Sequence, residues 1–357
     1  MVIPSLDLIL VRFGGAMAES MSTSAVHEHI LKPLVGAIVG PPLPASEIFK
    51  GVDFAPVDEI RITAQGSDNW PITWGDDDAQ YTSHGDGWGF EPRTDVKLSL
   101  GLAKVTGGPK DFQGENIRSE SGERIGQGPA GAKASGMLMV DGVLYMLVRN
   151  TGNSQLAWSA DRGRTWTWGF TFAESFGCPA FLNFGPNYAG ARDEWVYVYS
   201  SDGESAYESY DGVALARAPR ERITDAAAWE FLSGYSAGGE PVWSAQVADR
   251  IPVLSYPGHC RRLDVVFDPA QRRYLMALGH DAAGSWGIYD APEPWGPWTV
   301  IWHTDDWGLG KTHGYRLPAK WISPDGLAMQ LIFSGRRHGE VEYDAFCVRR
   351  MTLRPRR

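Results

Sequence analysis

The 357-residue sequence has few cysteines and no long apolar run. Its three cysteines lie far apart and form no CxxC pair. This scarcity excludes a disulfide framework and a cysteine zinc site, but it leaves one disulfide and one further thiol open. No stretch reaches the roughly 18 consecutive apolar residues that a transmembrane helix needs. We therefore expect neither a disulfide-stapled protein nor a membrane-spanning helix.

The sequence also lacks a basic excess and several common catalytic motifs. Lys and Arg number 33 against 43 Asp and Glu, a formal net charge of −10. Whole-surface attraction to nucleic acid or to an anionic membrane is therefore not expected, although a local basic pocket is compatible with this charge. There is no HExxH motif. The GDGWG run at 85–89 lacks the strand-turn-helix context of a dinucleotide-binding loop.

Aromatic residues and glycine are abundant instead. The chain contains 42 glycines, 23 prolines and 15 tryptophans, with 43% hydrophobic and only 21% charged residues. Short strands joined by tight turns have this composition, whereas helical bundles and coiled coils do not. The predicted fold class is all-β.

A repeat of paired apolar segments begins near residue 60. In each unit an apolar segment, a turn rich in Asp, Gly or Pro, and a second apolar or aromatic segment predict a β-hairpin. The five hairpins are 71–74 with 79–82, 136–140 with 143–148, 180–184 with 195–199, 263–267 with 274–278, and 319–322 with 328–333. A less hydrophobic strand pair follows each hairpin, and four strands per unit are typical of a propeller blade.

The repeat therefore predicts a single five-bladed β-propeller over residues 56–357, preceded by an N-terminal extension or leader over residues 1–55. Residues 2–11 are mostly apolar, and Ala16-Met17-Ala18 is similar to a signal-peptide cleavage site. However, Asp7 interrupts the apolar run and no basic residue precedes it. A poorly structured leader and a signal peptide remain as alternatives.

The segment from Ser159 to Trp166 fits the Asp-box pattern SxDxGxTW at every fixed position. In such a turn the Asp accepts backbone N–H bonds, the Gly takes a positive φ, and the Trp packs between blades. The pattern favours a propeller and assigns Asp161 a structural role.

Loops at the entry of each innermost strand, and at the exit of its partner, surround the central funnel of a propeller, where ligands bind. Acidic residues of different blades could protonate a leaving oxygen there and act on water or on the anomeric carbon, as a glycosidase requires. The candidate catalytic residues are Asp68, Asp86, Glu204 and His84. Each has a structural alternative, as a turn residue, a solvated loop charge or a satisfied buried imidazole.

The same loops supply candidate substrate-binding residues, several of them cationic. Lysine and arginine would grip an anionic sugar and would alter the acidity of nearby carboxylates. The candidates are Trp70, Lys133, Arg149, Asn150, Asp202, His259, Arg261, His313, Tyr315 and Arg316. No metal-ligating set is predicted.

Six segments resemble a known family. They are DNWPITW (68–74), HGDGWGF (84–90), KASGMLM (133–139), NSQLAWSADRGRTWTW (153–168), FGCPAFLNFG (176–185) and YDAPEPWGPWT (289–299). Together, across residues 60–353, they resemble a family of mainly bacterial propellers long catalogued as a domain of unknown function, some relatives of which are endo-D-arabinofuranases. More remotely, the PWGPW segment and the five-blade layout are similar to the arabinanase and levansucrase group of five-bladed glycosidases.

The remoter resemblance implies a set of catalytic residues. In that group, three acidic residues from the first three blades act as base, pKa modulator and acid. Asp68 or Asp86 would match the base and Glu204 the acid, but blade two offers Lys133 and Ser135 where a carboxylate is expected. This departure leaves open a lyase or hydrolase acting on a uronate-containing glycan, with His or Tyr removing a proton.

The sequence thus predicts a carbohydrate-active propeller for polysaccharide degradation, with a glycoside hydrolase as the leading hypothesis. The alternatives are a uronate-directed polysaccharide lyase and a non-catalytic glycan-binding propeller. The expected partner of the monomeric chain is an oligo- or polysaccharide, neutral or anionic, and neither nucleic acid nor a membrane. No cofactor is expected, although a structural calcium ion near the axis is compatible with the fold. The resemblance favours a secreted or periplasmic protein.

Overall fold

The computed structural model describes residues 2–3, 8–9, 40–335 and 344–356. Contacts divide the chain into two compact units, Met1–Pro42 and Leu43–Arg357. In the first unit β1 (Val2–Ile3) pairs antiparallel with β2 (Leu8–Ile9). Asp7, which interrupts the apolar run, and residues 16–18, which are similar to a cleavage site, lie outside the described residues. The second unit carries the predicted repeat.

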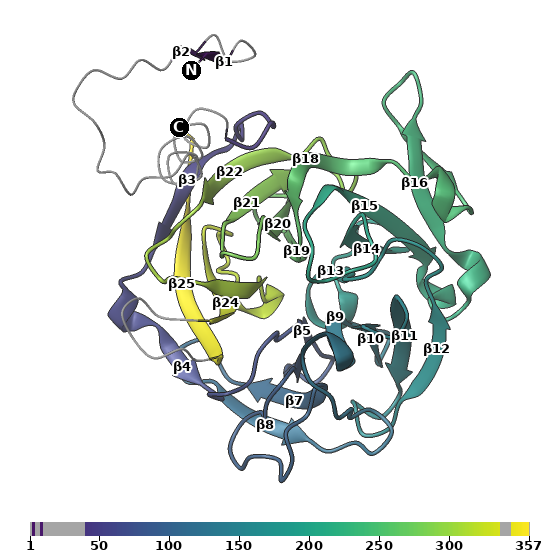
Figure 1. The fold of residues 1–357 in the computed structure, drawn as a ribbon, viewed down its shortest axis with the longest axis vertical. Helices are drawn as coiled ribbons and strands as arrows, with labels where there is room; N and C mark the ends of the chain where they lie inside the picture. The colour runs from purple at the N-terminus through teal and green to yellow at the C-terminus, as the bar shows by residue number, and fades with distance from the viewer. Residues whose placement is uncertain (1, 4–7, 10–39, 336–343, 357) are drawn as a thin grey trace, which may run out of the picture. The chain divides into compact units, whose positions relative to one another are not determined.

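The second unit is a ring of five antiparallel blades around a central axis (Figure 1). Blade one consists of β5 (Ile72–Trp74), β6 (Gln80–His84), β7 (Gly101–Thr106) and β8 (Gln113–Ile117). Blade two consists of β9 (Lys133–Val140), β10 (Val143–Arg149), β11 (Ser154–Ser159) and β12 (Thr167–Thr171). The all-β propeller prediction is confirmed, and the inner hairpins of these two blades lie where the repeat predicts them.

Blades three and four share one continuous sheet. Blade three consists of β13 (Ala180–Asn183), β14 (Trp195–Ser201), β15 (Tyr210–Pro219), β16 (Glu230–Tyr235) and β17 (Pro241–Ser244), with β18 (Pro252–Cys260) also paired to β15. Blade four consists of β19 (Leu263–Asp268), β20 (Arg273–Gly279), β21 (Trp286–Ala291) and β22 (Thr299–Thr304). A parallel pairing of β13 with β19, with Leu182 opposite Val265, joins the two blades.

Blade five is assembled from both ends of the second unit. It consists of β23 (Thr312–Arg316), β24 (Ala328–Gly335), β25 (Phe346–Pro355) and β3 (Phe49–Phe54), and β4 (Arg61–Thr63) pairs with the start of β25. The compact unit therefore begins at Leu43, earlier than the boundary at residue 55 that the sequence suggested. The segment 49–54 could not be recognised as part of the repeat. Its strand partner, β25, lies about 300 residues further along the chain, so the two strands form no hairpin.

The fifth predicted hairpin is corrected in one strand. The segment 319–322 is not the innermost strand, because Ala319–Trp321 forms the 3-10 helix η9 and β23 takes the inner position. Pro318 precedes the turn, and its carbonyl accepts the amide of Trp321 at 3.0 Å. The other 3-10 helices in the described ranges are η3 (Val57–Glu59), η4 (Gly128–Ala130), η5 (Pro186–Tyr188), η6 (Arg220–Arg222), η7 (Ala226–Ala228) and η8 (Val247–Asp249). Within the described ranges, no helix is long and apolar enough to cross a membrane.

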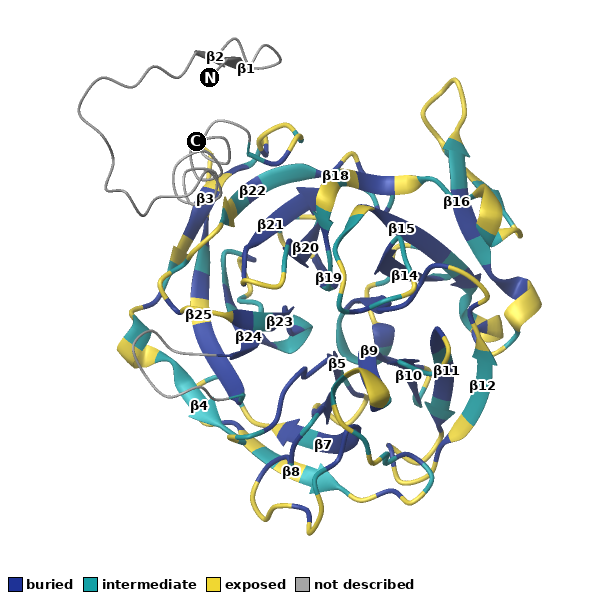
Figure 2. Cartoon of the chain, in the orientation of Figure 1, coloured by how far each residue is buried: buried dark blue, intermediate teal, exposed yellow. Residues whose placement is uncertain are grey.

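Burial falls from the axis to the rim (Figure 2). All eight residues of β9 are buried, whereas the outermost strand β8 contains no buried residue. An inner strand is covered on both faces by neighbouring blades, so its residues are buried throughout rather than alternating between buried and exposed. Cys178 and Cys260 are both buried and form no disulfide with each other.

The turn at 159–166 locks the outer part of blade two. Asp161 accepts the amide of Thr165 at 2.8 Å and its hydroxyl at 2.7 Å, and Gly163 has a φ of +90°. The indole of Trp166 is buried with side chains of blades one and two. This turn therefore acts as an interblade wedge.

Removing β3 is expected to destabilise the ring. A chain beginning at residue 56 leaves residues 351–355 of β25 without their partner strand. It also loses the buried side chains of Phe49 and Val52. Because burying one large apolar side chain contributes roughly 1.5–3 kcal/mol, we expect the free energy of unfolding to fall by at least about 3 kcal/mol. Urea denaturation measures this change against a matched chain beginning at Leu43. Equal midpoints for the two chains would contradict the closure by β3.

Candidate functional site

Asp68 lies at the entry to the innermost strand of blade one. It forms an isolated bridge with Gly85, in which the Asp68 amide donates to the Gly85 carbonyl at 2.9 Å and the Gly85 amide donates to the Asp68 carbonyl at 2.8 Å. The side chain is 9% exposed, and its Oδ1 is buried without a hydrogen-bond partner. A Cβ at Gly85 would lie 2.5 Å from this oxygen. Glycine at position 85 therefore permits the close approach of the carboxylate.

Asp86 stands beside this bridge and is paired with a buried lysine. Lys133, the first residue of β9, donates from Nζ to Asp86 Oδ1 at 2.8 Å and to the Gly128 carbonyl at 2.9 Å. The amide of Gly128 donates to Asp86 Oδ2 at 3.2 Å. Lys133 is buried, and its Cδ and Cε would lie 3.5 Å from a Cβ at Gly85. Asp68 and the Lys133–Asp86 ion pair therefore meet at one glycine.

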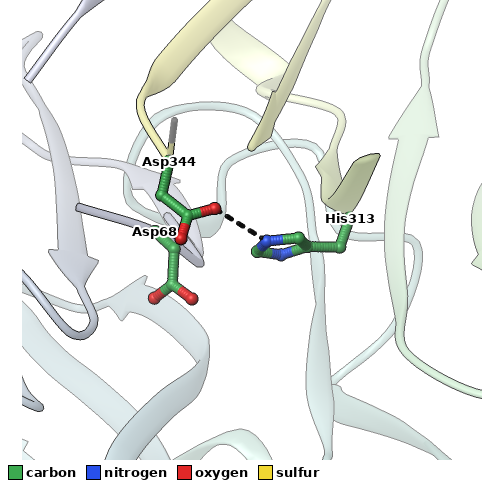
Figure 3. A group of neighbouring side chains, drawn as sticks. All are labelled: Asp68, His313 and Asp344. Atoms are coloured by element: carbon green, nitrogen blue, oxygen red, sulfur yellow. Dashed lines mark hydrogen bonds and ion pairs between the residues drawn. The ribbon is translucent and has the colours of Figure 1, made fainter. Parts of the chain in front are cut away.

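A second acidic group approaches Asp68 from blade five. His313 Nε2 lies 3.0 Å from Asp344 Oδ1, and Figure 3 shows His313 pointing toward the carboxylates of Asp68 and Asp344. One donor atom from each of the three residues lies within 4.8 Å of the others. Burial would raise the pKa of Asp344, but the hydrogen bond and charge of His313, together with the charges of Lys97 and Arg262, outweigh it and lower the pKa. We call Asp68, Asp86, Lys133, His313 and Asp344 the axial site.

The axial site has a donor set that can hold a divalent cation. Two carboxylates and one imidazole within 4.8 Å suit such an ion. His313 Nδ1 is buried without a hydrogen-bond partner, but Nε2 already faces Asp344. Arg262 interacts electrostatically with both Asp68 and Asp344, and this positive charge opposes a second cation there.

Three arginines lie together beside the axial site. They are Arg149 at the end of β10, and Arg261 and Arg262 between β18 and β19; we call them the arginine cluster. Tyr207 connects them, because its ring lies 5.4 Å from the Arg149 guanidinium and 5.2 Å from that of Arg262. Burial and the charges of Arg149 and Arg261 lower the pKa of Arg262 to about 10.

Four residues predicted to contact substrate or take part in catalysis are in the core instead. Trp70 is fully buried, and its indole donates to the Ala345 carbonyl at 3.1 Å. His84 is 1% exposed and packs against Trp70. Tyr315 stacks on Trp286, with ring centroids 4.2 Å apart, and its hydroxyl lies 2.9 Å from that of Thr312. These three side chains are packed against other core side chains in this structure.

Arg316 is the fourth of these core residues and joins three blades. Its Nη1 donates to the Leu263 carbonyl at 3.0 Å in blade four, and its Nε donates to the Asn69 carbonyl at 3.3 Å in blade one. Asp264 Oδ1 lies 3.6 Å from Nη1. Burial raises the pKa of Asp264 to about 6, although Arg316 opposes the rise. The predicted substrate-binding role of Arg316 is replaced by a structural one.

The remaining predicted residues lie in the surrounding loops. Asp202 accepts from Arg250 Nε at 2.6 Å and from the Ser175 hydroxyl at 2.9 Å, whereas Glu204 is exposed. His259 stacks on Tyr256, with ring centroids 4.3 Å apart. Asn150 donates from Nδ2 to the Gly131 carbonyl at 2.8 Å and to the Tyr207 hydroxyl at 3.3 Å. Of these, only Asn150 contacts the arginine cluster, through Tyr207.

Sequence reasoning missed Asp344 and Tyr207. Asp344 follows the loop after β24, and because the predicted strand 328–333 matches β24, the entry-and-exit rule covers this residue. Tyr207 lies in the loop between β14 and β15, next to the predicted Asp202 and Glu204. An aromatic residue in a funnel loop was the available signal.

A cavity of about 870 Å³ lies away from the axial site, beside the turn that links β5 to β6 and the turn that contains Asp161. Four of its charged groups form two ion pairs with each other. Lys104 lies 3.0 Å from Asp77, and Arg162 lies 3.2 Å from Asp76. The axial site differs because it keeps polar atoms without partners.

Comparison with known proteins supports the architecture. The sequence matches no protein-family model and no curated protein. A provisionally described hydrolase of Bacteroides ovatus is similar in structure, with 12% identity, a TM-score of 0.52, and coverage of 84% of this chain and 93% of that protein. What the two share is the fold.

Two further solved structures are similar at lower scores. The α-L-arabinofuranosidase PaAbf62A of Podospora anserina has 11% identity and a TM-score of 0.48 and covers 85% of this chain and 98% of its own. A GH43_1 enzyme of Xanthomonas citri has 13% identity and a TM-score of 0.45 and covers 84% and 89%. The relation to endo-D-arabinofuranases stays a prediction.

His84 is expected to make the fold sensitive to acid. Burial lowers the pKa of His84 to about 3, from 6.5 in an unstructured chain. Its stabilising contribution is therefore complete above pH 6.5 and is lost as the pH falls toward 3, amounting to about 2 kcal/mol between pH 8 and pH 5. His84→Met removes the titration without breaking a hydrogen bond, because neither ring nitrogen has a partner.

Chemical denaturation at pH 8 and pH 5 tests this expectation. The variant should lose less free energy of unfolding on acidification than the wild type. The acid sensitivity that remains should come in part from His280, whose pKa is also lowered to about 3 by burial. An unchanged difference between the two pH values would contradict the assignment to His84.

Proposed function

We propose that this chain is a glycoside hydrolase in which Asp68 and Asp86 act on a glycan bound at the axis of the ring. One observation carries the proposal. The carboxylate of Asp68 has a buried oxygen without a hydrogen-bond partner, and it meets the Lys133–Asp86 ion pair at Gly85. Two carboxylates in different electrostatic environments are what acid-base cleavage of a glycosidic bond requires.

The two carboxylates are suited to different roles. Asp86 accepts hydrogen bonds from the Lys133 ammonium and from the Gly128 amide, an arrangement that favours work as an anion on water or on the anomeric carbon. Asp68 Oδ1 accepts nothing, so it can exchange a proton with the oxygen of the scissile bond. Lys133 stands where the related glycosidases were expected to supply a carboxylate, and it orients Asp86 instead.

Glu204 is not needed in this scheme. Its side chain is exposed, and no hydrogen bond or ion pair of that side chain occurs within the described ranges. Its backbone instead packs against Gly177, where there is no room for a Cβ. The His313–Asp344 pair lies closer to Asp68 and is the better candidate for orienting a sugar hydroxyl.

The ring fold shared with a provisionally described hydrolase is consistent with this proposal. In the lyase alternative a His or Tyr removes a proton, and His84 and Tyr315 are the predicted site residues that we consider for this role. Both are buried, and the Tyr315 hydroxyl is already bonded to Thr312 and to the Gly284 carbonyl. We therefore favour hydrolysis over elimination.

Replacing either carboxylate should abolish turnover without unfolding the protein. Asp68→Asn and Asp86→Asn are each expected to lower the release of reducing ends by at least about 100-fold, the usual size of an acid-base contribution. The measurement uses a panel of arabinans, xylans and uronate-containing polysaccharides, and melting temperatures establish that the variants fold.

Glu204→Gln is the matched control, because it removes an exposed carboxylate of a neighbouring loop. It should keep the wild-type rate. Full activity of both aspartate variants would contradict the proposed catalytic roles of Asp68 and Asp86. Glycan binding by the wild type without release of any reducing end would identify a binding module.

Hydrolysis is expected not to depend on a divalent cation. Arg262 already supplies positive charge to Asp68 and Asp344, which weakens the binding of a metal ion between them. Protein dialysed against a chelator should therefore cleave the substrate at the same rate. Activity that is lost on dialysis and restored by Ca²⁺ would instead identify Asp68, His313 and Asp344 as ligands, in line with the calcium ion that the fold resemblance allows.

A further inference from the structure

We propose that the sugar bound at the axis carries an oxyanion, a uronate carboxylate or a sulfate ester, and that Arg149, Arg261 and Arg262 bind this group. This inference rests on the proposed function and adds the chemical class of the substrate. It follows from the charge of the cluster, from its free hydrogen-bond donors and from its position beside the axial site.

The arginine cluster has no counter-charge within the described part of the chain. None of its three guanidinium groups has a carboxylate within 4.0 Å there, although arginines elsewhere do. Arg217, for example, lies 2.8 Å from Glu230. Placing like charges together away from water is costly unless an opposite charge compensates them. A ligand anion would provide that compensation.

An acidic side chain near Arg261 is engaged elsewhere. Asp281 interacts electrostatically with Arg261. However, its Oδ1 already accepts the amides of Ala283, Gly284 and Ser285 at 2.8, 3.0 and 3.1 Å. The other cations of the axis are paired, Lys133 with Asp86 and Arg316 with Asp264. Within the described residues, the arginine cluster therefore lacks the close carboxylate partner that Lys133 and Arg316 have.

The cluster also holds unused hydrogen-bond donors. Arg149 is 1% exposed, and its Nε and Nη1 are buried without partners. Arg261 Nε is likewise buried and unpartnered. Guanidinium groups bind carboxylates and sulfates through paired N–H donors, so these free donors suit an oxyanion better than a neutral hydroxyl.

The guanidinium groups are held in place by the protein. Arg261 Nη2 donates to the Tyr207 carbonyl at 3.0 Å, and Arg262 Nε donates to the Ala206 carbonyl at 2.9 Å. The ring of Tyr207 lies beside the guanidinium groups of Arg149 and Arg262, and Asn150 donates to the Tyr207 hydroxyl. Tyr207 is therefore a positioning residue, and the site needs little reorganisation to bind an anion.

The cluster adjoins the proposed catalytic carboxylates. Arg262 interacts electrostatically with Asp68 and with Asp344. An anion bound by the cluster would therefore lie on a sugar at or next to the scissile bond. The charged group would fix the register of the glycan on the axial site.

Binding to a matched pair of oligosaccharides tests the inference. The pair is a uronate-containing oligosaccharide and the same oligosaccharide with its carboxyl groups reduced to alcohols, and a sulfated oligosaccharide forms a third arm. Titration calorimetry on the Asp68→Asn protein avoids turnover. The uronate or the sulfated ligand should bind at least about 10-fold more tightly than the reduced one, since a hydrogen bond to a charged group contributes about 1.5–3 kcal/mol.

Two variants locate the effect in the cluster. Arg149→Gln and Arg262→Gln, each combined with Asp68→Asn, should remove the preference for the anionic ligand while keeping the binding of the reduced one. Arg217→Gln, which removes an arginine paired with Glu230 in blade three, is the matched control and should keep the preference. Tyr207→Leu should weaken the preference and Tyr207→Phe should retain most of it.

The outcomes separate this inference from the proposed function. Equal binding of the charged and reduced ligands overturns the inference even if neutral glycans are hydrolysed, and it does so whether or not an arginine variant folds. A preference for the anion with no bond cleavage by the wild type supports the inference and contradicts the hydrolase. A product absorbing in the near ultraviolet indicates an unsaturated uronate, which supports anion binding and replaces hydrolysis by elimination.

Discussion

The pairing of β3 with β25 closes the ring, and the position of every other blade depends on that closure. A propeller in which both ends of the ring share one sheet has no free strand edge between its first and last blades. Closure also fixes where the innermost strands begin. Asp68, Lys133 and His313 stand at or near the starts of such strands, so residues far apart in the sequence meet at the axis.

Structural polar contacts hold the axial site in register. Asn69 follows Asp68, its side-chain amide donates to the Ala134 carbonyl in blade two, and its own carbonyl accepts from Arg316 in blade five. Asp68 is therefore anchored through its neighbour to blades on both sides. The buried Arg316 serves the scaffold, whereas the arginine cluster, without a carboxylate partner in the described residues, is left to serve a ligand.

Much of this arrangement could be predicted from the sequence. Hairpin periodicity located four of the five inner hairpins, and the loop rule selected Asp68, Asp86, Lys133, Arg149 and Arg261. The rule failed where a loop residue points inward, because sequence gives the position of Trp70 or Tyr315 but not the direction of its side chain. It also failed for β3, since a pairing across the whole chain leaves no local pattern.

The parallel pairing of β13 with β19 has a dynamic consequence. Blades three and four share backbone hydrogen bonds, whereas other neighbouring blades meet mainly through side chains. Amide protons in these two blades should therefore exchange with solvent as one cooperative unit. Tyr207 belongs to a loop of blade three, and Arg261 and Arg262 lead into blade four. We therefore expect the loop and the two arginines to move together. The distances between Tyr207, Arg261 and Arg262 should then stay constant when the ring fluctuates.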